Sequence, residues 1–330
     1  MKCRHPCRKC GHPCRKCGHG GLGSLTAPLI TVGFVELAGL FDGNAVVSDG
    51  GLATELETRH DLGDALWSAR LLLDAPEEIV AAHRAFFDAG AVIATTASYQ
   101  ASYSGFAARG IDRKAATALL HRSVELARQA RDEVAGDGVR RWVAASVGPY
   151  GAALADGSEY RGDYGLSVTA LRDWHLPRIE ALVEAEPDLL AVETVPDVVE
   201  AEALVAALGG ADVPAWLTYN VEGDRTRAGQ PLTEAFAVAA EAPEVVAVGV
   251  NCCAPDDVAG ALACARQVTD KPLVAYPNSG EGWDHDLRSW TGPATFSPEH
   301  LREWIAEGAQ VVGGCCRVGP ADIAALTRAL

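Results

Sequence analysis

The sequence predicts an α/β protein built as a single (β/α)8 barrel of the TIM type. Short apolar runs rich in Val, Ile, Leu and Ala recur along residues 45–313 without polar alternation, as expected for strands buried on both faces. A longer helical pattern follows nearly every run. Eight such units predict a barrel. A doubly wound sheet is the alternative, but no Gly-x-Gly-x-x-Gly follows the first run.

Each expected element has its own sequence signal. The eight strands share the apolar composition and lie at residues 45–49, 91–97, 141–147, 189–194, 214–219, 245–251, 272–277 and 309–313. The helices lie at residues 76–89, 112–135, 168–185, 197–208, 232–241, 256–267, 298–307 and 320–330. Asp74-Ala75-Pro76-Glu77-Glu78 and Ser297-Pro298-Glu299 supply caps, an early proline and first-turn acids. Gly90 and Gly308 are placed as helix ends.

The overall composition narrows the classes of partner. Hydrophobic residues make up 48% of the 330 residues, which is enough for a large core. There is no uncharged apolar run of eighteen residues, which argues against a membrane span. The net charge of −16 argues against nucleic acid, because phosphate binding needs a basic face. We therefore expect small-molecule substrates, and a monomer or small homo-oligomer.

The N-terminal segment differs from the rest of the chain. Residues 7–13 read Cys-Arg-Lys-Cys-Gly-His-Pro, and residues 14–19 repeat the first six of them. Two Cys-x-x-Cys units near histidines could bind zinc. A short exact repeat with almost no apolar side chains is, however, typical of a low-complexity extension. We expect residues 1–34 to be a disordered Cys/His-rich extension and residues 35–330 to form the barrel.

Cysteine usage predicts the compartment. Residues 25–41 follow a basic stretch as in a signal peptide, but Glu36 interrupts the apolar run and no clear small-residue cleavage site follows. Five of the ten cysteines lie within the first 17 residues. The five cysteines of the body do not form the disulfide framework typical of a small secreted domain. A reduced, cytoplasmic location is therefore predicted.

Two cysteine pairs mark the expected site. They end the runs Val248-Gly249-Val250-Asn251-Cys252-Cys253 and Val311-Val312-Gly313-Gly314-Cys315-Cys316. Adjacent cysteines do not easily bridge to each other, but they can place thiolates around one soft metal such as zinc. Reactive residues of a barrel lie at the C-terminal ends of its strands, where both pairs fall. Three thiolates with one open position are typical of a catalytic zinc site, and indicate chemistry on a sulfur.

Other strand ends add motifs that carry a family resemblance. Gly-Val-Asn-Cys at 249–252 and Gly-Gly-Cys-Cys at 313–316 resemble the homocysteine S-methyltransferase family, in particular its S-methylmethionine-dependent branch. The resemblance spans residues 43–328. Further similar motifs are Asp49-Gly50-Gly51, Leu66-Trp67-Ser68, Tyr99-Gln100-Ala101-Ser102, Glu193-Thr194-Val195-Pro196 and Tyr276-Pro277-Asn278-Ser279-Gly280-Glu281.

The resemblance implies a reaction and a set of ligands. Cys252, Cys315 and Cys316 are implied to bind Zn²⁺, and a methyl group is implied to pass from S-methylmethionine or S-adenosylmethionine to the thiolate of L-homocysteine. Methionine is the product. The implied substrate contacts are Glu193 for the homocysteine amino group, Asp49 as a second contact, and Trp67, Tyr99 and Asn278. The structural alternatives are helix capping for the carboxylates, packing for the rings and turn formation for the asparagine.

Two further readings of the chain stay open. One is a methyltransferase that uses betaine or another donor. The other is a non-catalytic zinc-binding or redox-sensing protein, motivated by the ten cysteines and the N-terminal repeat. Cys253 and Cys264 are expected to be packing thiols. The histidines of the barrel show no metal-ligand spacing and are expected on surfaces or in packing.

Overall fold

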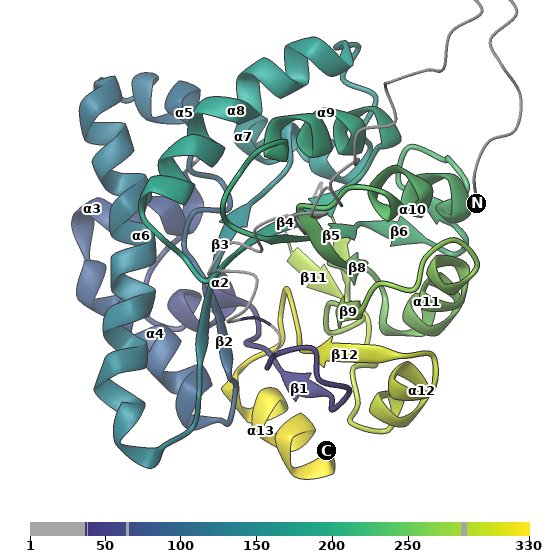
Figure 1. The fold of residues 1–330 in the computed structure, drawn as a ribbon. Coiled ribbons are helices and arrows are strands. Elements are labelled where there is room, and N and C mark those ends of the chain that lie inside the picture. Colours follow the sequence, from purple (N-terminus) through teal and green to yellow (C-terminus); the bar gives the residue numbers. More distant parts are fainter. Residues whose placement is uncertain (1–36, 38, 64–65, 285–288) are drawn as a thin grey trace, which may run out of the picture. The chain divides into compact units, whose positions relative to one another are not determined.

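The computed structural model describes residues 37, 39–63, 66–284 and 289–330. Predictions about residues 1–34 concern a segment outside the described residues. Within them, helices surround a sheet of eight parallel strands (Figure 1).

The eight strands form the wall of a barrel. Their order is β1, β12, β9, β8, β5, β4, β3, β2, and every neighbouring pair is parallel. The two ends of this order meet at a parallel bridge between Ser48 and Ile93, where Asp49 N donates to Ile93 O at 3.1 Å. The strands are β1 Val46–Val47, β2 Ile93–Thr95, β3 Trp142–Val147, β4 Leu189–Val195, β5 Ala215–Tyr219, β8 Val245–Asn251, β9 Leu273–Tyr276 and β12 Ala309–Val312. The predicted (β/α)8 barrel is thus confirmed.

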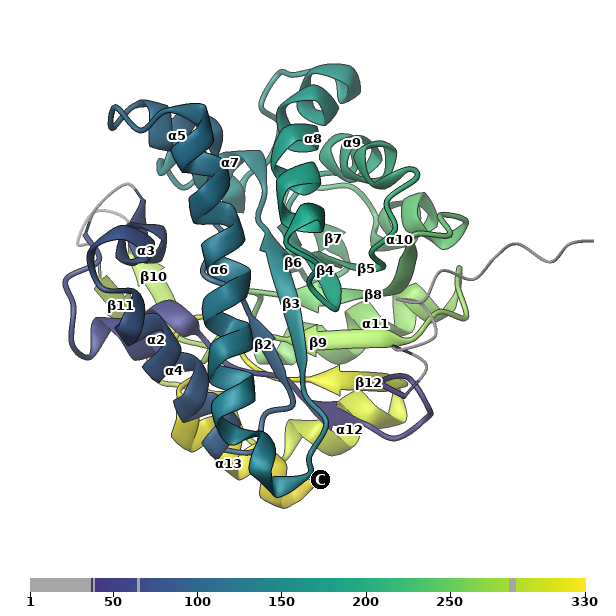
Figure 2. The ribbon, with the colours of Figure 1, turned by 60° about the vertical axis from the view of Figure 1, so that its left-hand side comes forward.

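All eight predicted helices are present around this wall. They are α4 Pro76–Asp88, α6 Arg113–Val134, α8 Val168–Glu184, α9 Val198–Leu208, α10 Leu232–Ala240, α11 Val258–Arg266, α12 His300–Ala306 and α13 Pro320–Ala329. Figure 2 shows the long α6 lying across the outside of β2 and β3. Each helix therefore covers the outer face of the barrel, as the repeated strand–helix pattern requires.

Several short elements in the connections were not predicted. They are the helices α2 Leu52–Glu57, η1 Trp67–Arg70, α3 Leu71–Asp74, α5 Tyr103–Ala107, η2 Ala135–Asp137, α7 Tyr150–Leu154, η3 Ser158–Tyr160 and η4 Pro255–Asp257. Two hairpins were not predicted either. They pair β6 Val221–Glu222 with β7 Arg225–Thr226, and β10 Gly282–Asp284 with β11 Ser289–Thr291. Elements this short carry too few residues to show a period in the sequence.

Helix boundaries follow part of the predicted chemistry. Asp74 does not cap α4, because it is the last residue of α3 and Ala75 occupies the cap position without a side-chain acceptor. Ser297 Oγ accepts from Glu299 N at 3.2 Å, and α12 begins one residue later. Gly90 and Gly308 have φ of 101° and 97°, a conformation that favours glycine, and each follows a helix end as predicted.

The alternation of side chains along each strand divides the core into two layers. On β3, Trp142 and Ala144 join a cluster inside the barrel, whereas Val143 and Ala145 pack in the larger layer under the helices. Trp216 fills the interior and donates from Nε1 to Tyr276 Oη at 3.1 Å. The interior is therefore a packed core, and the open end of the barrel is left for chemistry.

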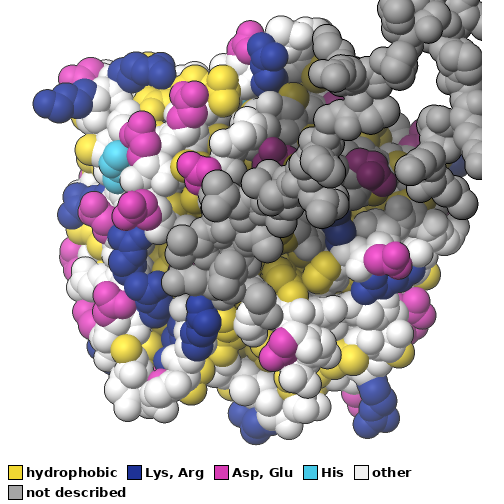
Figure 3. Space-filling model, in the orientation of Figure 1, with side chains coloured by type: hydrophobic (Ala, Val, Ile, Leu, Met, Phe, Trp, Pro, Cys, Tyr) yellow, Lys and Arg dark blue, Asp and Glu magenta, His cyan; other side chains and the backbone are white. Residues whose placement is uncertain are grey.

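The surface of the described residues mixes charges of both signs. On the face shown in Figure 3, acidic and basic side chains are interspersed among uncharged ones. In the part of the chain that the structure describes, no helix combines the length and apolarity needed to cross a bilayer.

We predict that His83→Leu stabilises the protein most strongly in acid. His83 is fully buried on α4, neither ring nitrogen has a hydrogen-bond partner, and burial lowers its pKa from 6.5 to about 4. The unfolded chain therefore takes up this proton between about pH 6.5 and 4 while the folded chain does not, so stability falls as the pH drops. Near pH 5 this linkage costs roughly 2 kcal/mol, which the leucine variant should recover.

Urea unfolding near pH 7.5 and near pH 5 tests this prediction. The gap between the unfolding midpoints of the wild type and the variant should widen in acid. The buried His175, whose pKa burial also lowers to about 4, is present in both proteins and cancels in the comparison. An equal gap at both pH values would contradict the assignment.

Candidate metal centre

Three cysteine sulfurs converge at the C-terminal rim of the barrel. Cys252 directly follows β8, and Cys315 and Cys316 lie on the loop after β12. Their Sγ atoms all lie within 4.8 Å of one another, and those of Cys252 and Cys316 are 3.8 Å apart. Among the described residues, this is the group of His, Cys, Asp and Glu side chains close enough to hold one metal ion.

The donor set fits a soft metal that keeps an open position. Three sulfurs are one short of the four ligands of a closed structural zinc site. Hydrogen bonds from Cys315 and Cys316 hold the pKa of Cys252 well below its usual range, while the same interactions raise the pKa values of Cys315 and Cys316. The three side chains thus share protons in a tight cluster, and a bound metal would take the place of those protons.

Asn278 joins the two cysteine loops. Its Nδ2 donates to Cys252 O at 3.0 Å, and its Oδ1 accepts from Cys316 N at 3.1 Å. Its backbone N donates to Cys253 O at 2.9 Å. Sequence reasoning considered a substrate contact or a turn for this residue, and the structure places its amide between the backbones that carry two of the three thiols.

Close backbone packing fixes the loop after β12. A side chain on Gly51 would place its Cβ 2.5 Å from Cys315 O, and one on Gly313 would place it 2.7 Å from Asp49 O. Gly314 N also donates to Asp49 O at 3.1 Å. The glycines therefore allow the loops after β1 and β12 to touch through their backbones, which holds Cys315 in place.

Two predicted carboxylates lie buried at the same rim. Asp49 accepts from Thr95 N at 2.6 Å and from Thr95 Oγ1 at 2.9 Å, and burial raises its pKa to about 8. Glu193 accepts a hydrogen bond from Ser146 Oγ, and burial, with a contribution from the charge of Cys252, raises its pKa to about 7. Neither carboxylate caps a helix, so the structural alternative for these two residues does not hold.

The two predicted aromatic contacts are placed differently. Tyr99 follows β2, and its backbone and ring lie against Gly148, where a Cβ would meet Tyr99 O at 2.5 Å. Burial and the neighbouring Cys252 raise the pKa of Tyr99 well above its usual range. Trp67 begins η1, and its side chain lies outside what the structure describes.

The long connection after β3 supplies residues that sequence reasoning missed. The hydroxyl of Tyr160 lies 3.6 Å from Cys252 Sγ, and Glu159 precedes it on η3. Residues 148–167 contain Gly, Tyr and acidic residues but no apolar period. Their position directly after a barrel strand was the available signal, because such connections build the active sites of barrels.

A buried charged network supports the connections after β2 and β3. Arg178 on α8 donates to Gly148 O and Ala101 O, and it lies 3.0 Å from Nδ1 of His175. Nε2 of His175 lies 2.8 Å from Glu200 Oε1, which also accepts from Tyr150 N at 2.6 Å. Because burial keeps the His175 ring neutral, it can donate to Glu200 and accept from Arg178 at once. This network holds the backbone on which Tyr99 packs.

The other cysteines and histidines that the structure describes stand apart from the cluster. Cys253 is buried in the outer core layer, and burial raises its pKa. Cys264 on α11 packs half-buried against the same layer. His121 lies 3.6 Å from Glu184 and His300 lies 3.4 Å from Asp256, while His285 lies outside the described residues.

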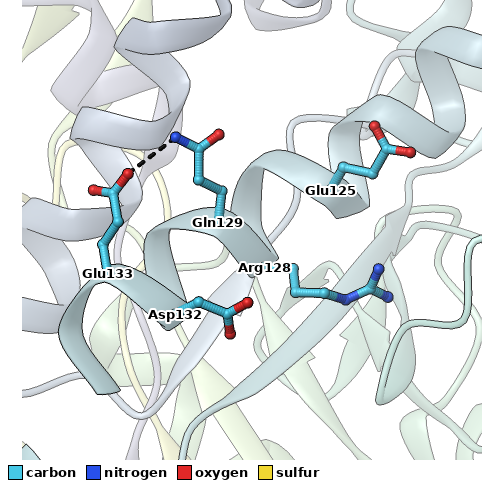
Figure 4. Close-up of a pocket in the computed structure, with 5 residues that line it drawn as sticks. All are labelled: Glu125, Arg128, Gln129, Asp132 and Glu133. Atoms are coloured by element: carbon cyan, nitrogen blue, oxygen red, sulfur yellow. Dashed lines mark hydrogen bonds between the residues drawn. The ribbon is translucent and has the colours of Figure 1, made fainter. Parts of the chain in front are cut away.

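The outer face of α6 carries a shallow hollow of about 510 Å³ (Figure 4). Its side chains already have protein partners: Gln129 donates to Glu133 at 2.9 Å, and Arg128 donates to the carbonyls of Ala185 and Glu186. A hollow formed by charged side chains of one surface helix lacks the convergent groups that a substrate site needs. This hollow is therefore a poorer candidate for a substrate site than the rim with the three thiols.

The fold and the site together define a TIM-type barrel with three clustered thiols, a candidate metal centre, at the C-terminal ends of its strands. The family model for homocysteine S-methyltransferase matches residues 46–330. The chain is 47% identical to Homocysteine S-methyltransferase of Escherichia coli strain K12, over 84% of this chain and 93% of that protein. It is 44% identical to Homocysteine S-methyltransferase 4 of Zea mays, over 94% and 95% of the two chains.

A solved structure agrees with these relatives. The metallated form of the homocysteine methyltransferase MmuM from Escherichia coli superposes with a TM-score of 0.81 and 45% identity, covering 88% of this chain and 99% of that chain. The chain belongs to the homocysteine S-methyltransferase family, as its motifs indicated.

We predict that Asn278→Ala lowers the affinity for a divalent metal roughly 10- to 100-fold, a range typical for loss of a group that orients metal ligands. The variant leaves Cys316 N and Cys252 O without the amide that joins them. Competition with a chromophoric chelator measures the affinity. Asn44→Ala, at an exposed residue, is the control and should match the wild type. Equal affinities in all three proteins would show that the loops hold without Asn278.

Proposed function

We propose that this chain transfers a methyl group from S-methylmethionine to the thiol of L-homocysteine and forms methionine, with Zn²⁺ held by Cys252, Cys315 and Cys316. The observation that carries the proposal is the convergence of three thiols within 4.8 Å at the C-terminal rim of the barrel. The family and the metallated form of MmuM support a metal-dependent reaction on this fold.

The proposed transfer is balanced without a redox partner. The homocysteine thiol releases its proton to solvent, and its sulfur forms a bond to the methyl carbon while the bond from that carbon to the donor sulfur breaks. The electron pair of the broken bond stays on the donor, so its sulfonium becomes a neutral thioether. Both products are methionine. When bound, zinc favours the thiolate form of a coordinated thiol as a Lewis acid.

The residues of the chain would position homocysteine. The buried carboxylates Glu193 and Asp49 are proposed to bind its ammonium group, because their present hydrogen-bond partners are uncharged hydroxyl and backbone groups. Tyr99 is proposed to form a wall of the site beside Cys252, and Trp67 remains a proposed substrate contact. Asn278 would act on the cysteine loops.

We also propose a cellular location and an oligomeric state for the enzyme. The five described cysteines are free thiols, which supports a reducing, cytoplasmic location. We propose that the protein acts as a monomer or small homo-oligomer on small molecules. S-Adenosylmethionine is the second donor to be compared.

Methionine formation from homocysteine and S-methylmethionine should stop when a zinc chelator is added, and it should resume when Zn²⁺ is restored. Cys315→Ala removes one of the three clustered sulfurs and should abolish both metal binding and turnover. Cys253→Ala is the matched control, because Cys253 is a buried thiol next to Cys252 but outside the cluster. Full activity of metal-free Cys315→Ala would refute the proposed centre.

Deletion of residues 1–34 should leave turnover unchanged within about twofold, because the proposed site lies wholly within residues 35–330. The same deletion tests the reading of the chain as a metal or redox sensor based on the N-terminal cysteines. Turnover and bound zinc per chain are measured for both lengths. Loss of both in the shortened chain would assign the metal to the N-terminal segment.

A further inference from the structure

Glu159 lies on the connection that reaches the candidate metal centre. It is held on η3 between Ser158 and Tyr160, and the hydroxyl of Tyr160 lies 3.6 Å from Cys252 Sγ. Burial raises the pKa of Glu159 to about 7, and the charge of Cys252 adds to this shift. Glu159 therefore directly precedes a residue that contacts the thiol cluster, on the side of the site formed by the connection after β3.

One oxygen of Glu159 is buried without a partner. Its Oε2 is shielded from solvent and has no hydrogen-bond partner. Arg161, two positions further on, is exposed, and its charge lowers the pKa of Glu159 by less than burial raises it. A buried carboxylate oxygen without a donor is costly, and such an atom at the rim of an active site indicates a group that a ligand completes.

The backbone around Glu159 is fixed in place. A side chain on Gly151 would place its Cβ 2.4 Å from Glu159 N, so α7 packs directly on this segment. Arg227 Nε donates to Tyr160 O at 3.2 Å, and Gly162 N donates to Ser158 O at 2.9 Å. The carboxylate is therefore held on a rigid support, as a specificity-determining residue requires.

The unpaired oxygen selects among the positive groups of a methyl donor. A sulfonium or a quaternary ammonium carries charge but no N–H, so it cannot donate a hydrogen bond to Oε2. A primary ammonium offers three donors and a charge. Oε2 of Glu159 can therefore accept a hydrogen bond from the α-ammonium group of a sulfonium amino acid. A methyl donor without an N–H, such as betaine, cannot form this hydrogen bond.

We propose that Glu159 binds the ammonium group of the methyl donor and so determines the preference for sulfonium amino acids. This inference rests on the proposed function and adds a second ammonium site to it. Glu193 and Asp49 face homocysteine, and Glu159 faces the donor.

Glu159→Gln tests the assignment through the Michaelis constants of the two substrates. The isosteric variant should raise KM for S-methylmethionine roughly 10- to 100-fold, the range for loss of a hydrogen bond between charged groups, and leave KM for homocysteine within about twofold. Calorimetric titration of S-methylmethionine into the metal-loaded protein should show the same weakening without turnover. Melting temperature and bound metal should match the wild type.

Two controls separate direct contact from general electrostatics. Asp156→Asn removes the same charge from the same connection, at an exposed residue whose Oδ1 accepts from Ser158 N, and should leave both KM values unchanged. 3-(Dimethylsulfonio)propionate carries a sulfonium but no ammonium, and its strength as a competitor of S-methylmethionine should be equal in the wild type and Glu159→Gln.

Three other outcomes would overturn the assignment of Glu159 to the donor. A rise in KM for homocysteine would place Glu159 at the acceptor, and an equal effect of Asp156→Asn would reduce it to long-range charge. Weaker competition by the propionate in Glu159→Gln would move the contact to the sulfonium. A wild type that binds S-methylmethionine by calorimetry but does not turn it over would refute the proposed function and leave the binding test of Glu159 intact.

Discussion

The arrangement of the site depends on the parallel pairing of β8, β9 and β12, which are neighbours in the sheet and therefore end side by side. Parallel strands end at the same rim, so three cysteines separated by up to 64 positions meet within a few ångströms. Asn278 after β9 uses both ends of its amide to connect the two cysteine loops. The glycines after β1 and β12 then allow the backbones of the two loops to touch, which fixes the position of Cys315.

The sequence was sufficient for the strands, the large helices and the two cysteine pairs, because each has a local signature. The choice of Cys252, Cys315 and Cys316 among the four came from the family resemblance. Buried parallel strands are continuously apolar, and Gly-Gly-Cys-Cys is unusual in itself. The amide of Asn278 could not be assigned in this way, since its two partners lie 26 and 38 positions away. Glu159 and Tyr160 were missed for a related reason, because tertiary contacts such as those with Gly151 and Arg227 hold their segment at the rim.

The wrong prediction of a helix cap at Asp74 shows that a local signal can also predict a contact that the structure does not form. Asp74, Pro76 and the acids that follow match the sequence pattern of a helix start. Asp74 is, however, the last residue of α3, and α4 begins without a side-chain cap. The early proline and the apolar face of α4 suffice, because most of the stability of a helix in a protein comes from tertiary packing. A motif of this kind therefore locates a helix more reliably than it identifies the contacts at its end.

The carboxylates of the rim explain why the site needs its ligands. Asp49, Glu159 and Glu193 have raised pKa values because they are buried, and the protein groups that hydrogen-bond Asp49 and Glu193 are uncharged. Burying anions without cations is unfavourable, so these groups take up protons more readily, and a bound cation would favour their ionised forms. The two proposed amino-acid substrates would bring two ammonium groups, and the proposed donor would bring a sulfonium that the transfer itself neutralises. The products would then carry one positive charge fewer than the substrates, and the acidic rim would hold them less tightly.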